Sequence, residues 1–278
     1  MKTRARIVAT LAAREIRVAL RGRWLVIGGV AFALLAIAVA QLGMAGAARW
    51  GVSTFDRTAA ALVNLVLLFV PLLALPLASA SFAGEAEDGT LAYLVAQPVR
   101  RGEVLLGKLC GLGAAMTLSL GLGFGAAALW IGASGAIRSL TFLALAGGAW
   151  LVAMAMLAIG ALLGVLARTR AQSLAAAIGA WITLVFLCDF GVLALAASQA
   201  VGPGALLGIT VANPLQAVKT LIALQVSTRL EVLGPAGSHA VRTLGRGNLA
   251  LLLGASVAAW IVLCTVGALR RFRREDLT

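Results

Sequence analysis

Six long apolar stretches constrain the fold of this chain more than any other feature of its sequence. Each has about 20 residues or more, which is the length that an α-helix needs to cross the hydrocarbon core of a bilayer. None alternates between apolar and polar residues, as the strands of a membrane β-barrel do. They run approximately over 24–46, 59–82, 109–131, 139–166, 172–198 and 249–269. The sequence therefore predicts an all-α integral membrane protein with six transmembrane helices.

The composition agrees with this class and excludes others. Of the 278 residues, 62% are apolar and only 12% are charged, and the mean hydropathy is +1.02. A soluble domain is about half apolar and a quarter charged, because it needs a polar surface. The same figures exclude an intrinsically disordered chain, and three Cys residues are too few for a disulfide scaffold.

The distribution of charge predicts the orientation of the chain in the membrane. The 23 Lys and Arg residues outnumber the 10 Asp and Glu residues and give a formal charge of +13. Six spans place both termini on one side, and 16 of the 23 basic residues then fall there: seven in 1–23, three in 100–108, two in 168–170 and four in 270–274. Cytoplasmic loops carry such an excess. We therefore expect both termini in the cytoplasm, contact with the lipid bilayer and no nucleic-acid partner.

The segment between the fifth and sixth stretches contains a further apolar run at 203–226, which Gly and Pro residues interrupt. Asn213 followed by Pro214 is typical of a helix start. A seventh span would move the basic tail to the outer side. We therefore expect a short re-entrant or interfacial outer helix, followed by a polar Gly- and Pro-rich stretch at 233–239.

The predicted organisation of the whole chain has seven parts. They are a cytoplasmic interfacial helix at 1–23, two spans within 24–82, a cytoplasmic segment at 83–108, three spans within 109–198, the outer segment at 199–248, the last span at 249–269 and a basic tail at 270–278.

The basic segment before the first span is predicted to be an amphipathic helix. Ile7, Leu11 and Val18 share one face of it, and Arg17 and Arg21 lie on a neighbouring stripe. Arg14 departs from this pattern, because it points with the apolar residues. The helix either anchors the chain at anionic headgroups or also contacts a cytoplasmic partner.

The cytoplasmic segment at 83–108 is predicted to be ordered. It holds four of the ten acids, and an apolar stripe at Leu91, Leu94 and Val95 follows a potential cap at Asp88 or Thr90. Pro98 ends this short helix, and a second short helix, at about 101–108, leads into the third span. The stripe either packs on the underside of the bundle or docks into a groove on another protein.

This segment resembles the signature that follows the second span in ABC-2 type transporter permeases. The matching residues are Glu85, Gly89-Thr90-Leu91, Leu94, Pro98-Val99-Arg100, Glu103 and Leu106-Gly107-Lys108. The resemblance implies a coupling helix that meets a nucleotide-binding subunit, with the N-terminal helix as the second contact. The implied coupling residues are Glu85, Glu87, Asp88, Gly89, Thr90, Leu91, Leu94, Pro98, Arg100 and Arg101, and those of the N-terminal interface are Arg14, Arg17 and Arg21.

Within that family the chain most resembles the NosY-type permeases, the membrane part of the transporter needed to mature copper-containing nitrous oxide reductase. The matching features are Phe55-Asp56-Arg57-Thr58-Ala59-Ala60, Cys188-Asp189-Phe190, Asn213-Pro214 and the Arg-rich end. The resemblance implies a homodimer in the bacterial inner membrane with two ATPase subunits and a periplasmic partner on the outer loops. It suggests a sulfur-containing species as the cargo.

The predicted spans contain few side chains that could bind or react with a substrate. Asp189 is the one ionisable side chain well inside a predicted span, so it either pairs across helices near the outer interface, with Arg57 or Arg49, or lies on a translocation path. Its Cys and Met residues are scattered without metal-ligand spacing, and we expect no metal site. We also expect no catalytic residues and no cofactor, since ATP and Mg²⁺ would bind the partner subunit.

Two Gly-x-x-x-Gly pairs, Gly121/Gly125 and Gly160/Gly164, lie within the third and fourth spans. Small residues at this spacing let helix backbones approach closely in a membrane. We expect both pairs to support tight packing without defining a dimer interface.

Three other functions compete with this hypothesis. A generic ABC-2 exporter of lipids or drugs would share every feature of the cytoplasmic segment. A membrane scaffold that transports nothing would use the same termini and outer loop to hold partners. An ion-coupled transporter would need either an inverted repeat or several intramembrane ionisable groups, and Asp189 is the one such group in the predicted spans.

Overall fold

The computed structural model of the chain describes residues 2–50, 54–89, 101–133, 139–198, 201–226 and 234–274, and these residues form helices and short turns without a strand. The helices are α1 Lys2–Arg21, α2 Trp24–Trp50, α3 Thr54–Glu87, α5 Arg101–Ala133, α6 Ser139–Leu166, α7 Arg170–Ile182, the π-helix η1 Thr183–Leu187, α8 Cys188–Ser198, α9 Pro203–Ala212, α10 Pro214–Val226, α11 Gly234–Leu244 and α12 Arg246–Arg274. The all-α prediction is confirmed.

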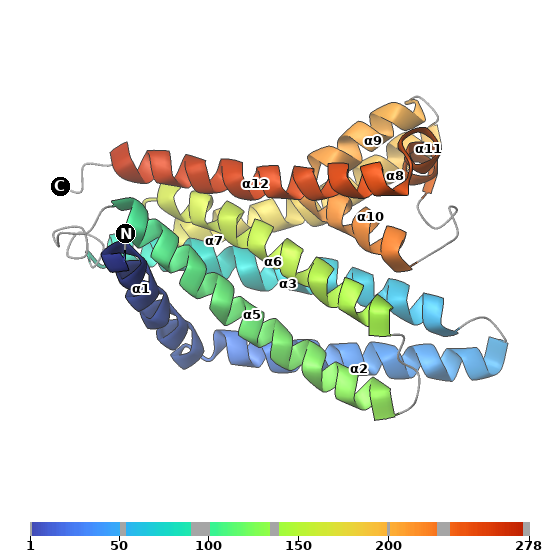
Figure 1. Cartoon of the computed structure of the whole chain (residues 1–278), viewed down its shortest axis with the longest axis horizontal. Helices are drawn as coiled ribbons and strands as arrows, with labels where there is room; N and C mark the ends of the chain where they lie inside the picture. Colours follow the sequence, from blue (N-terminus) through green and yellow to red (C-terminus); the bar gives the residue numbers. More distant parts are fainter. Residues whose placement is uncertain are drawn as a thin grey trace.

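Within the described residues, six helical units are each long and apolar enough to cross a membrane: α2, α3, α5, α6, the continuous α7–η1–α8 unit and α12. They form an elongated bundle in which α1 and the end of α12 lie together, so both termini are at one end (Figure 1). We call this the terminal end and the opposite one the far end. The number of spans agrees with the sequence-based prediction.

Two helices at the terminal end are longer than their apolar stretches. α3 continues to Glu87, and α5 begins at Arg101. The short helix expected at 101–108 is therefore not a separate element, because it forms the first turns of α5. Polar residues at a membrane surface continue a helix as readily as apolar ones, so the end of an apolar stretch does not mark the end of the helix.

The core of the bundle is centred on α6, which packs mainly against α3 and α12. At Gly160 and Gly164 a Cβ atom would lie 2.6 Å and 2.5 Å from the carbonyl oxygens of Leu75 and Ser79 in α3. This pair therefore allows direct backbone contact, as predicted. The other pair makes no such contact within the described chain, because a Cβ at Gly121 or at Gly125 would meet no atom within 4 Å. Residue spacing alone cannot show which helix face meets a neighbour.

The apolar run at 203–226 forms two helices, α9 and α10, which meet at an angle of 110°. Asn213 lies at the break and accepts a hydrogen bond from the Leu215 amide at 2.9 Å through Oδ1, so it caps α10 as predicted. Most of the first half of α10 is buried, including Pro214 and Val218. A bent helix pair thus stands where we expected one short re-entrant or interfacial helix, and α9 was not expected as a separate helix.

Side chains of α12 satisfy backbone carbonyls at the C-terminal ends of α9 and α10. Ser256 Oγ and Trp260 Nε1 donate to the last carbonyls of α9, and an Arg246 guanidinium nitrogen donates to the Leu224 carbonyl of α10 at 2.6 Å. Non-helical backbone is tolerated at membrane depth only where such partners exist. The bent pair can therefore lie within the bundle as part of the membrane domain.

Most of the polar Gly- and Pro-rich stretch at 233–239 is helical, because α11 covers Gly234–Leu244. Pro235 stands in its first turn, where the missing amide hydrogen costs nothing. α11 packs against α9 and α12 at the far end (Figure 1).

Candidate functional site

The predicted coupling residues divide into two groups. Glu85, Glu87, Asp88, Gly89 and Arg101 lie in the part of the chain that the structure describes. The remaining five, which are Thr90, Leu91, Leu94, Pro98 and Arg100, lie outside the described residues. The site is therefore built from the helices on either side of the segment 90–100.

Four charged side chains from three helices meet at the terminal end. Lys108 Nζ of α5 lies 2.7 Å from Glu85 Oε2 of α3 and 3.4 Å from Glu15 Oε1 of α1. Arg14 Nη1 lies 3.3 Å from Glu85 Oε1 and 3.5 Å from Glu15 Oε1. We call these four residues the charge cluster. Its two positive and two negative charges alternate in space, so each has an opposite charge beside it.

Two members of the charge cluster are almost completely buried. The side chain of Lys108 is 1% exposed, and that of Glu15 is 4% exposed. Lys108 also donates to the Ser81 carbonyl at 3.4 Å and lies 5.1 Å from the centre of the Phe82 ring. A buried charge is tolerated only when it is paired and hydrogen-bonded. The cluster thus fixes the relative positions of α1, α3 and α5.

Two glycines explain why α1 can approach α5 so closely. A Cβ at Gly107 would lie 2.7 Å from Leu11 Cβ, and one at Gly111 would lie 2.5 Å from Glu15 Cβ. These residues form a third Gly-x-x-x-Gly pair, which the sequence-based prediction did not select. α1 therefore packs on the bundle and does not only lie at a membrane surface.

The structure also explains the irregular position of Arg14 on the α1 face. Arg14 points toward the bundle because it pairs with Glu85. Arg17 donates to the Ala13 carbonyl of its own helix at 3.2 Å, and Arg21 is exposed, so neither belongs to the charge cluster. Glu15 and Lys108 were not predicted as site residues. The available signal was that Glu15 is the one acid in the basic segment 1–23.

The end of α3 is tied to the start of α7. Glu87 Oε2 accepts a hydrogen bond from the Arg170 amide at 2.7 Å, at the positive end of the α7 dipole. Thr169 caps the same helix by accepting from the Gln172 amide at 3.2 Å. α3 itself ends at Glu87, and Gly89 follows with a φ of +69°, the left-handed conformation that glycine adopts readily after a helix.

The start of α5 is tied to the end of α12. Arg101 Nη1 donates to the carbonyls of Phe272 and Arg273 at 3.2 Å and 3.0 Å. A cation at a helix C-terminus compensates the unpaired carbonyls and the negative end of the dipole. The helices on both sides of the segment 90–100 are thus fixed in the bundle. The end of α3 is bonded to α1, α5 and α7, and the start of α5 is bonded to α12.

A second polar group lies toward the far end, around Asp189 of α8. Lys219 Nζ of α10 lies 3.0 Å and 3.3 Å from its two carboxylate oxygens, and Gln216 Nε2 donates to Oδ1. The exposed fractions of the Asp189 and Lys219 side chains are 51% and 36%. The expected pairing was with Arg57 or Arg49, whose side chains lie outside the described residues. The described partners come from the re-entrant helix.

The π-helix η1 lies one turn before this polar group. Its Leu184 carbonyl accepts a hydrogen bond from Asn213 Nδ2 at 3.0 Å. A π-helix shifts the hydrogen-bond register and frees backbone carbonyls, and such turns are frequent at functional sites. The α7–η1–α8 unit is therefore attached to the α9–α10 break at Leu184 and to α10 at Asp189.

The α7–η1–α8 unit is the least covered of the six candidate spans. None of its apolar window is buried within the described chain, whereas the other five windows are 22–67% buried. Large apolar side chains stand exposed along it, including Ile182, Leu187 and Leu193. This surface must be covered by lipid or by another protein.

Among the residues that the structure describes, no group of three or more His, Cys, Asp or Glu side chains could hold a metal ion. Cys110, Cys188 and Cys264 are free thiols on different helices.

The comparisons with known proteins agree with the resemblance. The sequence matches the family model described as ABC-2 family transporter protein over residues 9–277. It is 36% identical over 194 residues to the probable ABC transporter permease protein NosY of Pseudomonas aeruginosa, and 34% identical over 193 residues to that of Stutzerimonas stutzeri. Each match covers 68% of this chain and 70% of the relative. With its six apolar spans, the chain therefore belongs to the ABC-2 transporter permease family as a NosY-like, multi-pass protein of the bacterial inner membrane.

Proposed function

We propose that two copies of this permease work with two copies of a separate ATPase subunit, which binds ATP and Mg²⁺. The chain supplies the membrane path and no catalytic residue. The observation that carries the proposal is the anchoring of the segment 90–100, which is held through Glu85 and Glu87 on one side and Arg101 on the other.

Such anchoring suits the transmission of force. The ATPase would push on the segment 90–100 when it closes around ATP. Because Glu85 is joined to Lys108 and Arg14, displacement of the end of α3 would move α1 and α5 with it. The exposed Arg17 and Arg21 on α1 would form the second contact with the ATPase. Because the ATPase is a cytoplasmic subunit, the terminal end then faces the cytoplasm, in agreement with its basic residues.

The uncovered α7–η1–α8 surface supports the homodimer. A second copy would bury its apolar side chains and would place Asp189 and Lys219 close to the boundary between the copies. An intramembrane acid costs free energy and is by default a functional group. Asp189 is therefore the residue that we assign to the translocation path.

The cargo and direction follow from the likeness to NosY-type permeases. We propose export of a sulfur-containing species to the periplasm, for copper-site assembly of nitrous oxide reductase. The far end, which carries α9 and α11, would then receive a periplasmic partner protein.

The ATPase contact can be tested by co-purification. Leu94→Asp should abolish co-purification of the ATPase and ATP-driven transport, because a charge would enter the apolar stripe. The matched control is Leu244→Asp in α11, which makes the same change at an exposed leucine of the far end. If the unchanged chain binds no ATPase, or if Leu94→Asp leaves transport intact, the proposal is wrong.

A second experiment separates a transporter from a scaffold. Protease cleavage within the outer segment 199–248 is measured on the reconstituted complex with and without ATP. A transporter should show altered cleavage when ATP is added, because its helices rearrange. A scaffold should show the same cleavage in both conditions. A transporter that then moves lipids or drugs, and no sulfur-containing species, would be a generic exporter.

A further inference from the structure

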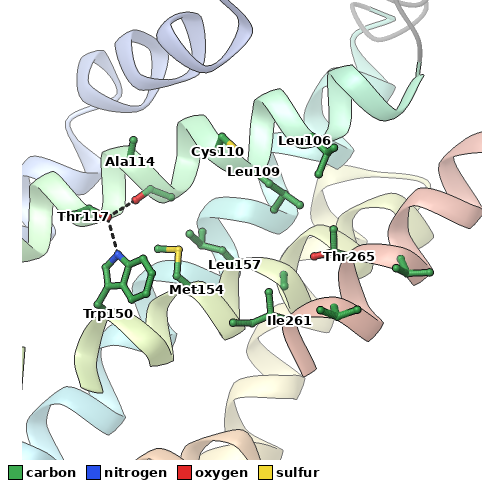
Figure 2. Close-up of a pocket in the computed structure, with 14 residues that line it drawn as sticks. Leu106, Leu109, Cys110, Ala114, Thr117, Trp150, Met154, Leu157, Ile261 and Thr265 are labelled. Atoms are coloured by element: carbon green, nitrogen blue, oxygen red, sulfur yellow. Dashed lines mark hydrogen bonds between the residues drawn. The ribbon is translucent and has the colours of Figure 1, made fainter. Parts of the chain in front are cut away.

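An apolar groove lies between α5 and α12, with α6 as its floor. It has a volume of about 630 Å³, and its lining includes Leu106, Cys110 and Thr117 of α5, Trp150 and Met154 of α6 and Val266 of α12. Figure 2 shows side chains from all three helices directed into the same space. This volume lies within the range of about 300–1,000 Å³ that is usual for small-molecule sites.

The groove extends over about one leaflet of a bilayer. From Leu106 to Thr117 the α5 backbone rises ~16 Å at 1.5 Å per residue, and half of the hydrocarbon core is ~15 Å. The groove begins near the terminal end, since Leu106 is in the second turn of α5. The length of the groove therefore matches that of an acyl chain in one leaflet.

The two ends of the groove differ in polarity. At the terminal end, α5 and α12 close on each other, because a Cβ at Gly102 would lie 3.4 Å from Leu269 Cδ1 and 3.7 Å from an Arg273 guanidinium nitrogen. Arg270 follows Val266 by one helical turn and is exposed. Two cations therefore stand where the groove reaches the membrane surface.

At the deep end the polar atoms are already paired. Trp150 Nε1 donates to Thr117 Oγ1 at 3.0 Å, and that hydroxyl donates to the Gly113 carbonyl at 2.8 Å (Figure 2). The indole N–H and the hydroxyl therefore need no hydrogen-bond partner from a ligand. Acyl carbon can lie against them without leaving a hydrogen bond unmade.

We propose that this groove is a binding site for an anionic phospholipid. Its acyl chain occupies the groove, and its phosphate lies against Arg270 and Arg273. Each basic residue near the membrane surface favours an anionic headgroup about fivefold. This argument rests on the proposed function, which assigns a second copy of the chain to the α7–η1–α8 surface, whereas the groove is lined by α5, α6 and α12. The groove is therefore left to lipid.

The test uses fluorescence quenching of Trp150 in the full chain, reconstituted in vesicles. The other five of the six Trp residues are replaced by Phe, and brominated phosphatidylglycerol or brominated phosphatidylcholine is added to an unbrominated background. We expect phosphatidylglycerol to quench at a mole fraction at least fivefold lower. Equal quenching by the two lipids would show ordinary lipid contact and would overturn the proposal.

Two double variants locate the headgroup. Arg270→Gln with Arg273→Gln should remove the preference for phosphatidylglycerol. The matched control, Arg6→Gln with Arg21→Gln, removes two exposed charges from α1 at the same end and should keep it. A preference that persists in the first variant, or disappears in both, contradicts the assignment.

A third measurement tests the alternative occupant. Cys110 is exposed in the groove, so a second copy seated there would bring the two Cys110 thiols together. Oxidation of a chain whose other two cysteines are replaced by Ala should leave it uncross-linked. Efficient cross-linking through Cys110 would show that the groove is a protein interface, and the lipid site would be wrong. None of these measurements requires the ATPase, so they fail independently of the proposed function.

Discussion

Lys108 shows how one buried side chain can hold the terminal end together. It is almost completely buried, and its ammonium group lies between the carboxylates of Glu15 and Glu85. Water cannot replace either partner at this depth. The stability of the terminal end therefore depends on pairing within the charge cluster more than on the number of its charges.

Lys108→Met should destabilise the protein by about 3–5 kcal/mol, because two buried carboxylates would lose their shared cation. The measurement is the free energy of unfolding in a detergent titration. Arg17→Met is the control, since that exposed side chain bonds to a carbonyl of its own helix and should contribute at most about 1 kcal/mol. Equal losses in the two variants would contradict the structural role of the charge cluster.

The cluster also predicts a rescue. Glu15→Gln in the Lys108→Met background neutralises the more deeply buried of the two carboxylates, while Arg14 still pairs with the other, Glu85. The double variant should be more stable than Lys108→Met alone, by about 1 kcal/mol or more. Additive losses would mean that Glu15 and Lys108 do not interact.

At the scale of elements, glycine positions decide which helices touch. Gly164 and Gly121 both belong to Gly-x-x-x-Gly pairs, yet one meets the Ser79 carbonyl and the other meets no atom. The sequence pattern identified both pairs and could not distinguish them. The difference arises because helix rotation is set by packing against the other helices.

Gly164→Leu should destabilise the bundle by about 3 kcal/mol, because the new side chain would collide with the α3 backbone, which cannot move aside. Gly121→Leu should change the free energy of unfolding by no more than about 0.5 kcal/mol. The two variants are compared by thermal unfolding in the same detergent. If Gly121→Leu is as damaging as Gly164→Leu, the described helix packing is wrong.

The break between α9 and α10 depends on Asn213, which serves two elements at once. Asn213→Ala should cost about 1–2 kcal/mol, since the cap of α10 is lost and the Leu184 carbonyl loses its donor. Asn248→Ala is a suitable control, because that exposed amide bonds only to the Leu244 carbonyl. Indistinguishable unfolding curves for the two variants would show that the break needs no cap.

At the scale of the whole molecule, the uncovered α7–η1–α8 unit predicts where a second copy lies. Leu187→Cys, in a background without the three native cysteines, should form a cross-linked dimer on oxidation. Leu129→Cys on α5 is at least as exposed and should remain monomeric. Cross-linking at Leu129 and not at Leu187 would place the interface elsewhere.

The sequence by itself determined the class of the protein, the six spans and the helix start at Asn213-Pro214. These follow from local properties, because the length of an apolar stretch, an Asn-Pro start and the sign of the flanking charges act without long-range contacts. The coupling role of the segment 83–108 was predicted from its resemblance to ABC-2 permeases and stays a prediction.

Only the tertiary structure decided how distant residues combine. It placed Glu15 of α1 beside Lys108 of α5, gave Asp189 the partner Lys219, and joined Arg101 to the end of α12. The physical reason is that a charge or a small residue in an apolar chain can be satisfied from any helix that passes within about 4 Å. Which helix passes there depends on the packing of the whole bundle, and no single stretch of sequence contains that information.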